Sequence, residues 1–570
     1  MDKIRSFVKK NNTICLVIGL FLLFLLIQVR YMYVVRFDPD ELDIYVNGFE
    51  MVNGKILYKD IPSQHMPWTY IISSFFYLIG AHSVPMQRLC FYILFAGFWT
   101  SFVFVYKDYV NKWILILQAL LYHMILQHLD FATQILSEHL SVIGAQIFLL
   151  EFLMFIKKRD ISIGSCIRMS IAVVMTFGAA FITIFSLFFI AVGVFALEIK
   201  WGIEEHEKAS HWWKKMFIRY GRLVGIVAVP WIGMICYMIA THSLGDFWLG
   251  AYTVNREYYP RYMEGLGGGI ASTFITSFNQ LAKYLMSLSL GGLNLMIIIQ
   301  LFMIGCGLYF VYKIGRKEGF IVGFTLFLYI FTYGSRGFFN YHGATFVGVI
   351  ALVTAYVMVN YLYCKPKEFD SKPLFYKASI CSLTTALIIM YCMNITMMLS
   401  FIKGIETNEY QNDTELVELL TDEDERVWQT NVNNSICWFS KRVSSGPTVS
   451  TPWMWDAIGH KGIDEAIKNP PRVAIFQIGY ESWGHNMADY APEAYYFIVN
   501  NYKHLPTSDM IWVHKDYYND ACFLLGIDPD TPDDSGVGTT PFTVDDSELP
   551  GKTPEDRQYE LEHPKEDSGN

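Results

Sequence analysis

The chain has 570 residues, of which 53% are hydrophobic and only 17% charged, whereas an ordinary soluble domain carries about 25% charged residues. This composition excludes a soluble globular protein and a disordered one, and many apolar runs approach the roughly 20 residues that cross a bilayer. Residues 1–401 hold 32 Lys and Arg against 22 Asp and Glu, while residues 402–570 hold 12 against 31. We therefore expect a membrane module at 1–401, followed by an acidic aqueous part.

The first apolar run, residues 14–29, follows a basic segment and has no small-residue cleavage site, so it predicts a signal anchor. Further candidate spans lie near 84–106, 113–129, 139–156, 167–182, 184–199, 223–240, 293–312, 320–334, 343–363 and 378–401. The expected fold class is an α-helical polytopic membrane protein with about eleven transmembrane helices. With the N-terminus in the cytoplasm, 23 of the 32 Lys and Arg of the membrane module fall on the inner side, as the positive-inside rule requires. The odd number of spans then places residues 402–570 outside.

Three segments on the outer side are long enough to carry a function. Residues 36–83 form an amphipathic first outer loop, and residues 241–292 hold a tyrosine-rich stretch followed by a glycine run at 265–269. The third segment, 402–525, is predicted to be a small α/β domain, with strands at 472–479 and 510–514 and a helix at 494–502. From 526 to 570 acidic residues, Pro, Gly and Thr dominate, which predicts a disordered acidic tail.

The cysteine, histidine and glycine patterns indicate which disulfides, metal sites and nucleotide-binding motifs the chain could contain. Cys437 and Cys522 are alone in the predicted outer domain, so a disulfide between them and two free thiols are both open. No Cys or His spacing predicts a metal site; no cofactor is predicted, and a divalent metal is left open. The chain has no Walker or Rossmann glycine motif and no basic tract outside the inner loops, so ATPase, dehydrogenase and nucleic-acid-binding functions have no support.

The most informative segment lies just outside the first span, where Asp38, Asp40, Glu41 and Asp43 fall within six positions. Crowded carboxylates raise one another's pKa and can keep one of them as a proton acceptor. A hydrophilic helix start, where acids are stabilised by the helix N-terminus, explains the same residues without chemistry. Glu138, at the outer end of the fourth span, has the same two interpretations, with Ser137 as the expected N-cap of the second one.

The order of these features resembles the polytopic glycosyltransferases of the GT-C class, especially the bacterial branch related to protein O-mannosyltransferases and aminoarabinose transferases. The resemblance covers roughly residues 10–400, and it rests on Asp40-Glu41, Gly54, Leu57-Tyr58-Lys59-Asp60, Gln64-His65-Met66-Pro67 and Arg88. It implies a GT-C fold and a reaction outside the membrane. A sugar carried on a polyprenyl phosphate would be transferred, with inversion, to an exported cell-envelope glycan or lipid acceptor.

The resemblance also implies which residues form the site. Asp40 matches the general base of the family, with Asp38 as its nearest competitor. The expected catalytic residues are Asp40, Glu41 and Glu138, and the expected substrate-binding residues are Asp38, Tyr58, His65, Arg88, Tyr259, Arg336, Tyr341 and His342.

At three places the sequence departs from the family pattern, which weakens the roles that the resemblance implies for the residues there. His65 stands where members often carry Lys, Thr183 stands where many have a cation, and Tyr341 and His342 are in reversed order. Each candidate also has a plain structural explanation: interfacial snorkelling for Arg88, an ordinary loop histidine for His65, and a membrane-interface belt for the tyrosines. The tyrosines around 252–262 are otherwise expected to close over sugar and lipid as a mobile loop.

A transporter or lipid flippase is the alternative function. Transporters usually show repeated halves and interrupted helices near the membrane midplane, but the chain has no internal repeat, and its candidate charges cluster at the outer ends of spans. Glycosyl transfer is therefore the leading hypothesis, with the lipid-linked donor, the envelope acceptor and membrane lipids as partners and no nucleic acid. The sequence identifies neither the sugar nor the acceptor.

Overall fold

The structure is a computed structural model of the whole chain. It describes residues 12–29, 39–126, 135–178, 184–205, 209–262, 295–334, 343–362, 410–430, 435–446, 451–458 and 463–530, with six separate residues between 373 and 385. The predicted acidic tail lies outside the described residues beyond position 530.

Helices occupy the segments predicted to span the membrane, apart from 378–401, which lies almost entirely outside the described residues. They are α2 (Asn12–Val29), α6 (Val84–Val105), α7 (Lys112–Leu126), α8 (Ser137–Lys158), α9 (Ile163–Phe177), α10 (Ile184–Glu204), α11 (Ala209–Ala240), α15 (Leu295–Glu318), α16 (Phe320–Gly334) and α17 (Ala344–Val357) with its π-helical extension η4 (Met358–Leu362). Among the described helices, four are long and apolar enough to cross a membrane: Val84–Val105, Ser137–Lys158, Ser210–Ala240 and Ala344–Leu362. The total of about eleven spans stays a prediction.

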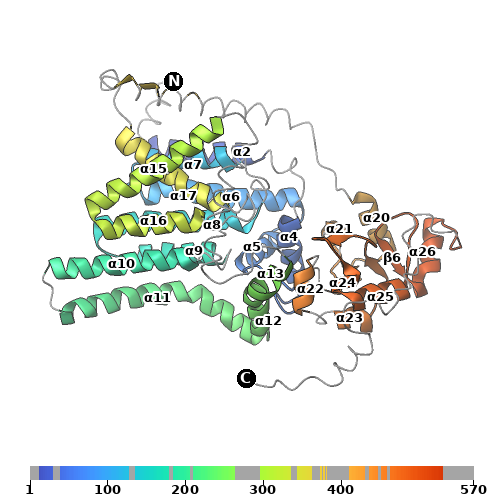
Figure 1. Ribbon diagram of the computed structural model, residues 1–570. Helices are drawn as coiled ribbons and strands as arrows, with labels where there is room; N and C mark the ends of the chain where they lie inside the picture. Colours follow the sequence, from blue (N-terminus) through green and yellow to red (C-terminus); the bar gives the residue numbers. More distant parts are fainter. Residues whose placement is uncertain are drawn as a thin grey trace.

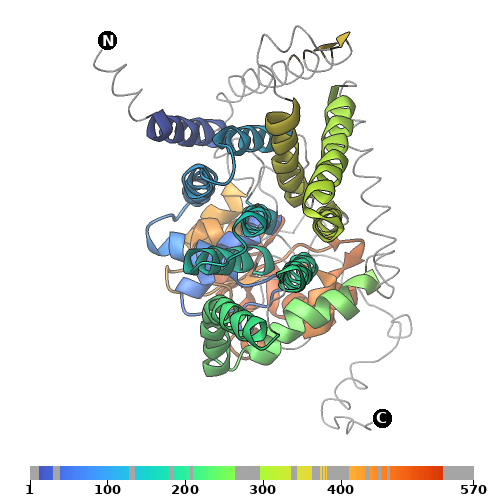
Figure 2. The ribbon, with the colours of Figure 1, turned by 90° about the vertical axis from the view of Figure 1, so that its left-hand side faces the viewer.

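The helices lie side by side in a bundle around α8, whose apolar stretch is completely buried (Figures 1 and 2). Two glycines allow the close contacts. A Cβ at Gly144 would come within 2.5 Å of Thr176 on α9, and one at Gly348 of α17 within 2.6 Å of Val142. Small residues at such crossings are the usual means by which helices pack in membranes, where the lipid itself is apolar.

The segment between α2 and α6 forms two helices that lie between the bundle and the C-terminal part of the chain (Figure 1). They are α4 (Pro39–Val52) and α5 (Trp68–Leu78). Residues 53–67 connect them and are here called the turn between α4 and α5. A Cβ at Gly48 would lie 2.6 Å from the hydroxyl oxygen of Ser73, so glycine permits the two helices to touch. The segment is thus folded over its described length, 39–83.

The second outer segment continues from α11 through α12 (Leu244–Trp248), the π-helix η2 (Leu249–Tyr258) and α13 (Tyr259–Tyr262). Gly250 brings η2 against the turn between α4 and α5, since a Cβ there would lie 2.2 Å from the carbonyl oxygen of Ser63. The glycine run at 265–269 lies outside the described residues.

The described residues from 410 to 530, here called the C-terminal region, combine short helices with a mixed sheet. The strands are β1 (Trp428–Gln429), β2 (Val473–Ile475), β5 (Tyr502–His504) and β6 (Ile511–His514), in the order β1-β2-β6-β5, with β1 and β2 parallel and the other pairs antiparallel. A hairpin of β3 (Glu481–Ser482) and β4 (His485–Asn486) stands apart from this sheet. The helices are α20 (Gln411–Leu420), α21 (Ser435–Ser440), α22 (Pro452–Ile458), α23 (Ile463–Lys468), α24 (Met487–Tyr490), α25 (Pro492–Asn501), the 3₁₀ turn η5 (Lys515–Tyr517) and α26 (Tyr518–Leu525).

The two strands and the helix predicted from sequence are found as β2, β6 and α25. Cys437 and Cys522 are both buried in the core of this region and both are free thiols, so the structure does not contain the disulfide that the sequence left open.

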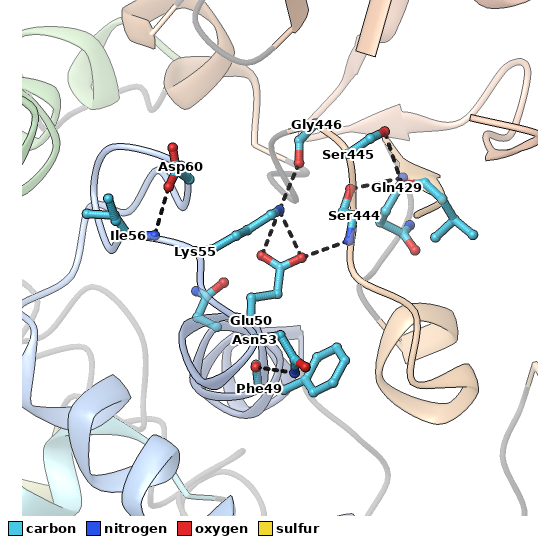
Figure 3. A network of polar contacts seen from close by, with 12 residues as sticks. Phe49, Glu50, Asn53, Lys55, Ile56, Asp60, Gln429, Ser444, Ser445 and Gly446 are labelled. Atoms are coloured by element: carbon cyan, nitrogen blue, oxygen red, sulfur yellow. Dashed lines mark hydrogen bonds and ion pairs between the residues drawn. The ribbon is translucent and has the colours of Figure 1, made fainter. Parts of the chain in front are cut away.

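The C-terminal region contacts α4 and the turn that follows it through the large side chain of Trp438 and through hydrogen bonds from Ser444 to Glu50 and from Lys55 to Gly446. Trp438 is fully buried, with its ring 5.9 Å from that of Tyr45 and 6.3 Å from that of Phe49. Beside it, Glu50 of α4 pairs with Lys55, as Figure 3 shows. These contacts fix the C-terminal region against the α4 end of the bundle.

Candidate functional site

The helix α4 presents two different polar faces. Asp40, Asp43 and Asn47 are three or four residues apart and therefore share one face, whereas Glu41 and Tyr45 lie on another. Asp40 is only partly buried, in the first turn of the helix. Its negative charge contributes, after burial, to raising the pKa of Tyr259 to about 12, which places the phenol of α13 close to this carboxylate.

Asp43 is held by two hydrogen bonds. The hydroxyl of Tyr70 donates to Oδ2 at 2.7 Å, and the side-chain amide of Asn47 donates to Oδ1 at 2.8 Å. The pKa of Asp43 is raised from 3.8 to about 6, mainly by burial and in smaller part by the charge of Asp40, while His65 and the two donors oppose the shift. General bases that work near neutral pH are tuned in this direction. The sequence marked Asp43 as one of four crowded carboxylates but not as a site residue, although its i, i+3 spacing from Asp40 places it on the same face. Asn47 and Tyr70 were not predicted from sequence.

The turn between α4 and α5 supplies the other groups next to Asp43. Ser63 and Tyr70 share a hydrogen bond of 2.7 Å between their hydroxyls, which extends the network away from Asp43. Tyr58 donates from its hydroxyl to the backbone carbonyl of His65 at 2.8 Å, and its φ of 70° shows a tight turn. Tyr58 is thus buried and holds the backbone of the turn, while the His65 imidazole lies near enough to Asp43 to lower its pKa.

The predicted site residues Glu41 and Arg88 are paired with each other. The guanidinium of Arg88 donates from Nε to Glu41 Oε1 at 2.8 Å and from Nη2 to Oε2 at 2.5 Å, and both side chains are buried. Tyr45 and the backbone N–H of Ile135 also donate to Oε1 of Glu41, at 2.8 and 3.2 Å. In this arrangement the Arg88 guanidinium is engaged by a carboxylate, so the pair fixes α4 to α6 and to the residues that precede α8.

Glu138 lies in the first turn of α8, close to the Glu41–Arg88 pair, because Ile135 contacts Glu41 three residues earlier. The helix begins at Ser137 itself, so Leu136 and not Ser137 occupies the N-cap position. Ser137 instead donates from its hydroxyl to Glu138 at 3.1 Å. Glu138 is buried, with 4% of its surface exposed.

The candidates Asp38, Arg336, Tyr341 and His342 lie outside the described residues, as does Thr183. Their roles stay predictions. Among the described residues, no three His, Cys, Asp or Glu side chains are grouped so that they could hold a metal ion. The described site is therefore a pair of neighbouring carboxylates, Asp40 and Asp43, with hydroxyl, amide and imidazole groups around them.

Comparison with solved structures identifies the fold. The chain is similar to ArnT from Cupriavidus metallidurans in its apo state, with a TM-score of 0.53 and 10% sequence identity, over 88% of this chain and 98% of that one. It is also similar to the same protein bound to undecaprenyl phosphate, with a TM-score of 0.50 and 10% identity, over 82% of this chain and 96% of that one. No protein-family model and no curated protein matches the chain. At this identity the likeness shows the fold, which is the GT-C fold that the resemblance implied.

Proposed function

We propose that this protein is a membrane glycosyltransferase that moves a sugar from a polyprenyl-phosphate donor to an exported cell-envelope glycan or lipid. The observation that carries the proposal is the ArnT-like fold together with a partly exposed carboxylate, Asp40, at the start of the first outer helix. ArnT was crystallised with undecaprenyl phosphate, which makes a polyprenyl phosphate the natural leaving group to test. The proposal places the N-terminus in the cytoplasm and the C-terminal region outside.

In the proposed reaction Asp40 is the general base. An acceptor hydroxyl gives its proton to the Asp40 carboxylate while its oxygen attacks the anomeric carbon of the donor. The bond between that carbon and the phosphate oxygen breaks, polyprenyl phosphate leaves with the electron pair, and the anomeric configuration inverts. General-base catalysis of this kind contributes about 10²- to 10⁴-fold to the rate.

Asp43 is the second carboxylate of the proposed site. Its hydrogen bonds to Tyr70 and Asn47 fix its position, and its raised pKa of about 6 means that it is mostly ionised at neutral pH. We assign it the task of orienting the acceptor next to Asp40. His65 is assigned to the charge of the donor or of the leaving phosphate, together with Arg336 and His342 as sequence-based candidates.

We assign a positioning role to the buried pair of Glu41 and Arg88. This role replaces the catalytic role expected for Glu41 and the phosphate-binding role expected for Arg88 from the sequence. Its bidentate geometry aligns the first turn of α4, and with it the neighbouring Asp40, against α6. Glu138 is kept as a candidate acid on the acceptor side.

The test is transfer activity of purified carboxylate variants with a panel of polyprenyl-phosphate sugars and isolated envelope glycans. Asp40→Asn keeps the size of the side chain and removes its basicity, so we expect normal folding and a rate lower by about 10²-fold or more. Asp38→Asn is the matched control and should lose much less. Full activity in Asp40→Asn with loss in Asp43→Asn would move the base to Asp43, and full activity in all three variants would contradict glycosyl transfer by this loop.

A further inference from the structure

Aromatic rings from two parts of the chain that are far apart in the sequence pack together next to the turn between α4 and α5. Tyr259 and Tyr262 come from α13, Trp453 comes from α22, and Trp483 and His485 come from the β3–β4 hairpin; we call these five side chains the aromatic wall. The ring of Trp453 lies 4.7 Å from that of Tyr259 and 5.5 Å from that of Trp483, and the rings of Tyr262 and His485 are 5.1 Å apart.

The aromatic wall adjoins the proposed catalytic carboxylates. The indole N–H of Trp453 donates to Gln64 Oε1 at 2.6 Å, and Gln64 stands between Ser63 and His65, which belong to the surroundings of Asp43. At the other end of the wall, Tyr259 lies close enough to Asp40 for the charge of that carboxylate to raise the pKa of the phenol. A molecule that touches the wall therefore has the candidate base within reach.

Trp483 has two features that packing alone does not explain. It is 48% exposed, whereas Trp453, the other tryptophan of the wall, is 2% exposed. It also has a φ of 56° and is followed by Gly484 with a φ of 78°, so the two form the tip of a two-residue hairpin loop. This turn geometry favours Asn-Gly, and a bulky residue with positive φ is a strained choice. Strain of this kind is concentrated at binding and catalytic sites.

We propose that the aromatic wall binds a sugar ring of the acceptor, with Trp483 as the exposed stacking surface. This inference rests on the proposed function and specifies the acceptor as a saccharide, or as a lipid or polymer that carries one. One face of a pyranose ring presents C–H groups, which pack on an aromatic ring, and its hydroxyls point outward to polar groups. Tyrosine and tryptophan suit such a ligand because each combines a large apolar face with a polar edge.

Polar side chains stand at the edges of the wall where sugar hydroxyls would lie. Arg261 and Asp456 face each other at 3.6 Å, and each is more than one third exposed. His485 is partly exposed, and Gln64 faces Trp453. A belt of aromatic side chains at the membrane interface is the competing explanation. Trp453 does not fit such a belt, because it is only 2% exposed and is hydrogen-bonded within the protein. For the exposed ring of Trp483, lipid contact is distinguished from sugar binding by the quenching measurement below.

The test uses Trp483→Asn in the full-length protein reconstituted in nanodiscs. This variant creates the Asn-Gly sequence that the turn prefers, so folding and thermal stability should be preserved. Binding is measured by saturation-transfer NMR with linear oligosaccharides of glucose, galactose, mannose and N-acetylglucosamine. We expect at least one of them to bind the wild type, and Trp483→Asn to weaken that binding by about tenfold or more, as for other aromatic anchor residues.

Three further samples make the outcome decisive. Trp213→Ala removes another exposed tryptophan, on α11, and should bind as the wild type does. Trp483→Tyr should retain most of the binding. Asp40→Asn should bind the saccharide normally even where it abolishes transfer, which separates this inference from the assignment of the base. Absence of saccharide binding to the wild type, or equal binding by Trp483→Asn, would overturn the inference. So would loss of quenching by brominated lipids in Trp483→Asn, which would place the ring in the membrane interface.

Discussion

The hydroxyl of Tyr70 on α5 donates a hydrogen bond of 2.7 Å to the carboxylate of Asp43 on α4. The bond closes the turn between the two helices and fixes one carboxylate three residues away from the partly exposed Asp40. The network continues to Ser63 through the same hydroxyl. The two acids thus differ in surroundings, and neighbouring carboxylates with different surroundings commonly take different roles in one site.

The raised pKa of Asp43 predicts that this carboxylate lowers the stability of the fold at neutral pH. Burial raises its pKa from 3.8 to about 6. Folding favours the protonated form of this side chain. Its stabilising contribution is therefore complete below pH 3.8 and is lost as the pH rises through about 6. Asp43→Asn has no charge to form and can keep the network, because its amide N–H₂ can donate to Tyr70 while Tyr70 donates to Ser63. We expect its Tm advantage over the wild type to grow between these two pH values and then to stay constant, as measured by thermal unfolding in detergent.

Tyr70→Phe provides the matching test of the same carboxylate. The hydrogen bond from Tyr70 lowers the pKa of Asp43, so its removal should move the upper end of the stability change to higher pH. A Tm difference between Asp43→Asn and the wild type that does not depend on pH would show that Asp43 has its ordinary pKa.

The Glu41–Arg88 pair should be essential for folding and not for the chemical step. Arg88→Met leaves the Glu41 carboxylate buried without its guanidinium, and breaking a buried pair in this way costs about 3–5 kcal/mol. We expect a large loss of Tm and of folded yield. The double variant Glu41→Gln with Arg88→Met should recover part of both, because no unpaired charge remains. A well-folded Arg88→Met protein with a strongly raised KM for the donor would instead support the original assignment of Arg88 to phosphate binding.

The membrane helices were predictable because each is a long apolar run, and this signal is local in the sequence. β2 and β6 were predictable for a similar reason, since Val473–Ile475 and Ile511–His514 are short runs of apolar residues with β-branched side chains. The topology of the sheet and the β3–β4 hairpin were not predicted, because they depend on pairing between segments and on backbone geometry that no apolar pattern specifies.

The site was only partly predictable because its contacts join residues that are far apart in the sequence. Arg88 is 47 residues from Glu41, and Gln64 is 389 residues from its partner Trp453. The sequence singled out Glu41 as a catalytic and Arg88 as a substrate-binding candidate, but it could not show that each is the partner of the other. Likewise, Trp483 stood in no recognisable motif, and its importance comes from its φ and its neighbours.

The thiols of Cys437 and Cys522 should be unreactive in the folded protein and both reactive after unfolding without reductant. Both are fully buried, and burial raises the pKa of the Cys437 thiol far above its usual value. Alkylation with a maleimide, followed by mass spectrometry of the peptides, checks this. Labelling of either residue only after reduction would show that it forms a disulfide.

The last prediction concerns how the C-terminal region is held on α4. Lys55 donates to both carboxylate oxygens of Glu50 at 3.1 Å and lies 3.4 Å from the carbonyl oxygen of Gly446, while the backbone N–H of Ser444 donates to Glu50 at 3.1 Å (Figure 3). Burial raises the pKa of Glu50, and the charge of Lys55 opposes that shift. The ion pair therefore offsets part of the cost of burying this carboxylate, which accepts the hydrogen bond from the C-terminal region.

Lys55→Met should loosen this contact, because it removes both the counter-charge of Glu50 and the donor to Gly446. We expect faster hydrogen exchange in peptides that cover residues 442–446, and lower transfer activity, since the aromatic wall is built partly on the same C-terminal region. Lys59→Met removes an exposed lysine four residues away and should change neither. Glu50→Gln combined with Lys55→Met removes the buried charge and should restore part of the exchange protection. Unchanged exchange in Lys55→Met would show that the other contacts, such as those of Trp438 and Trp453, hold the C-terminal region in place without this ion pair.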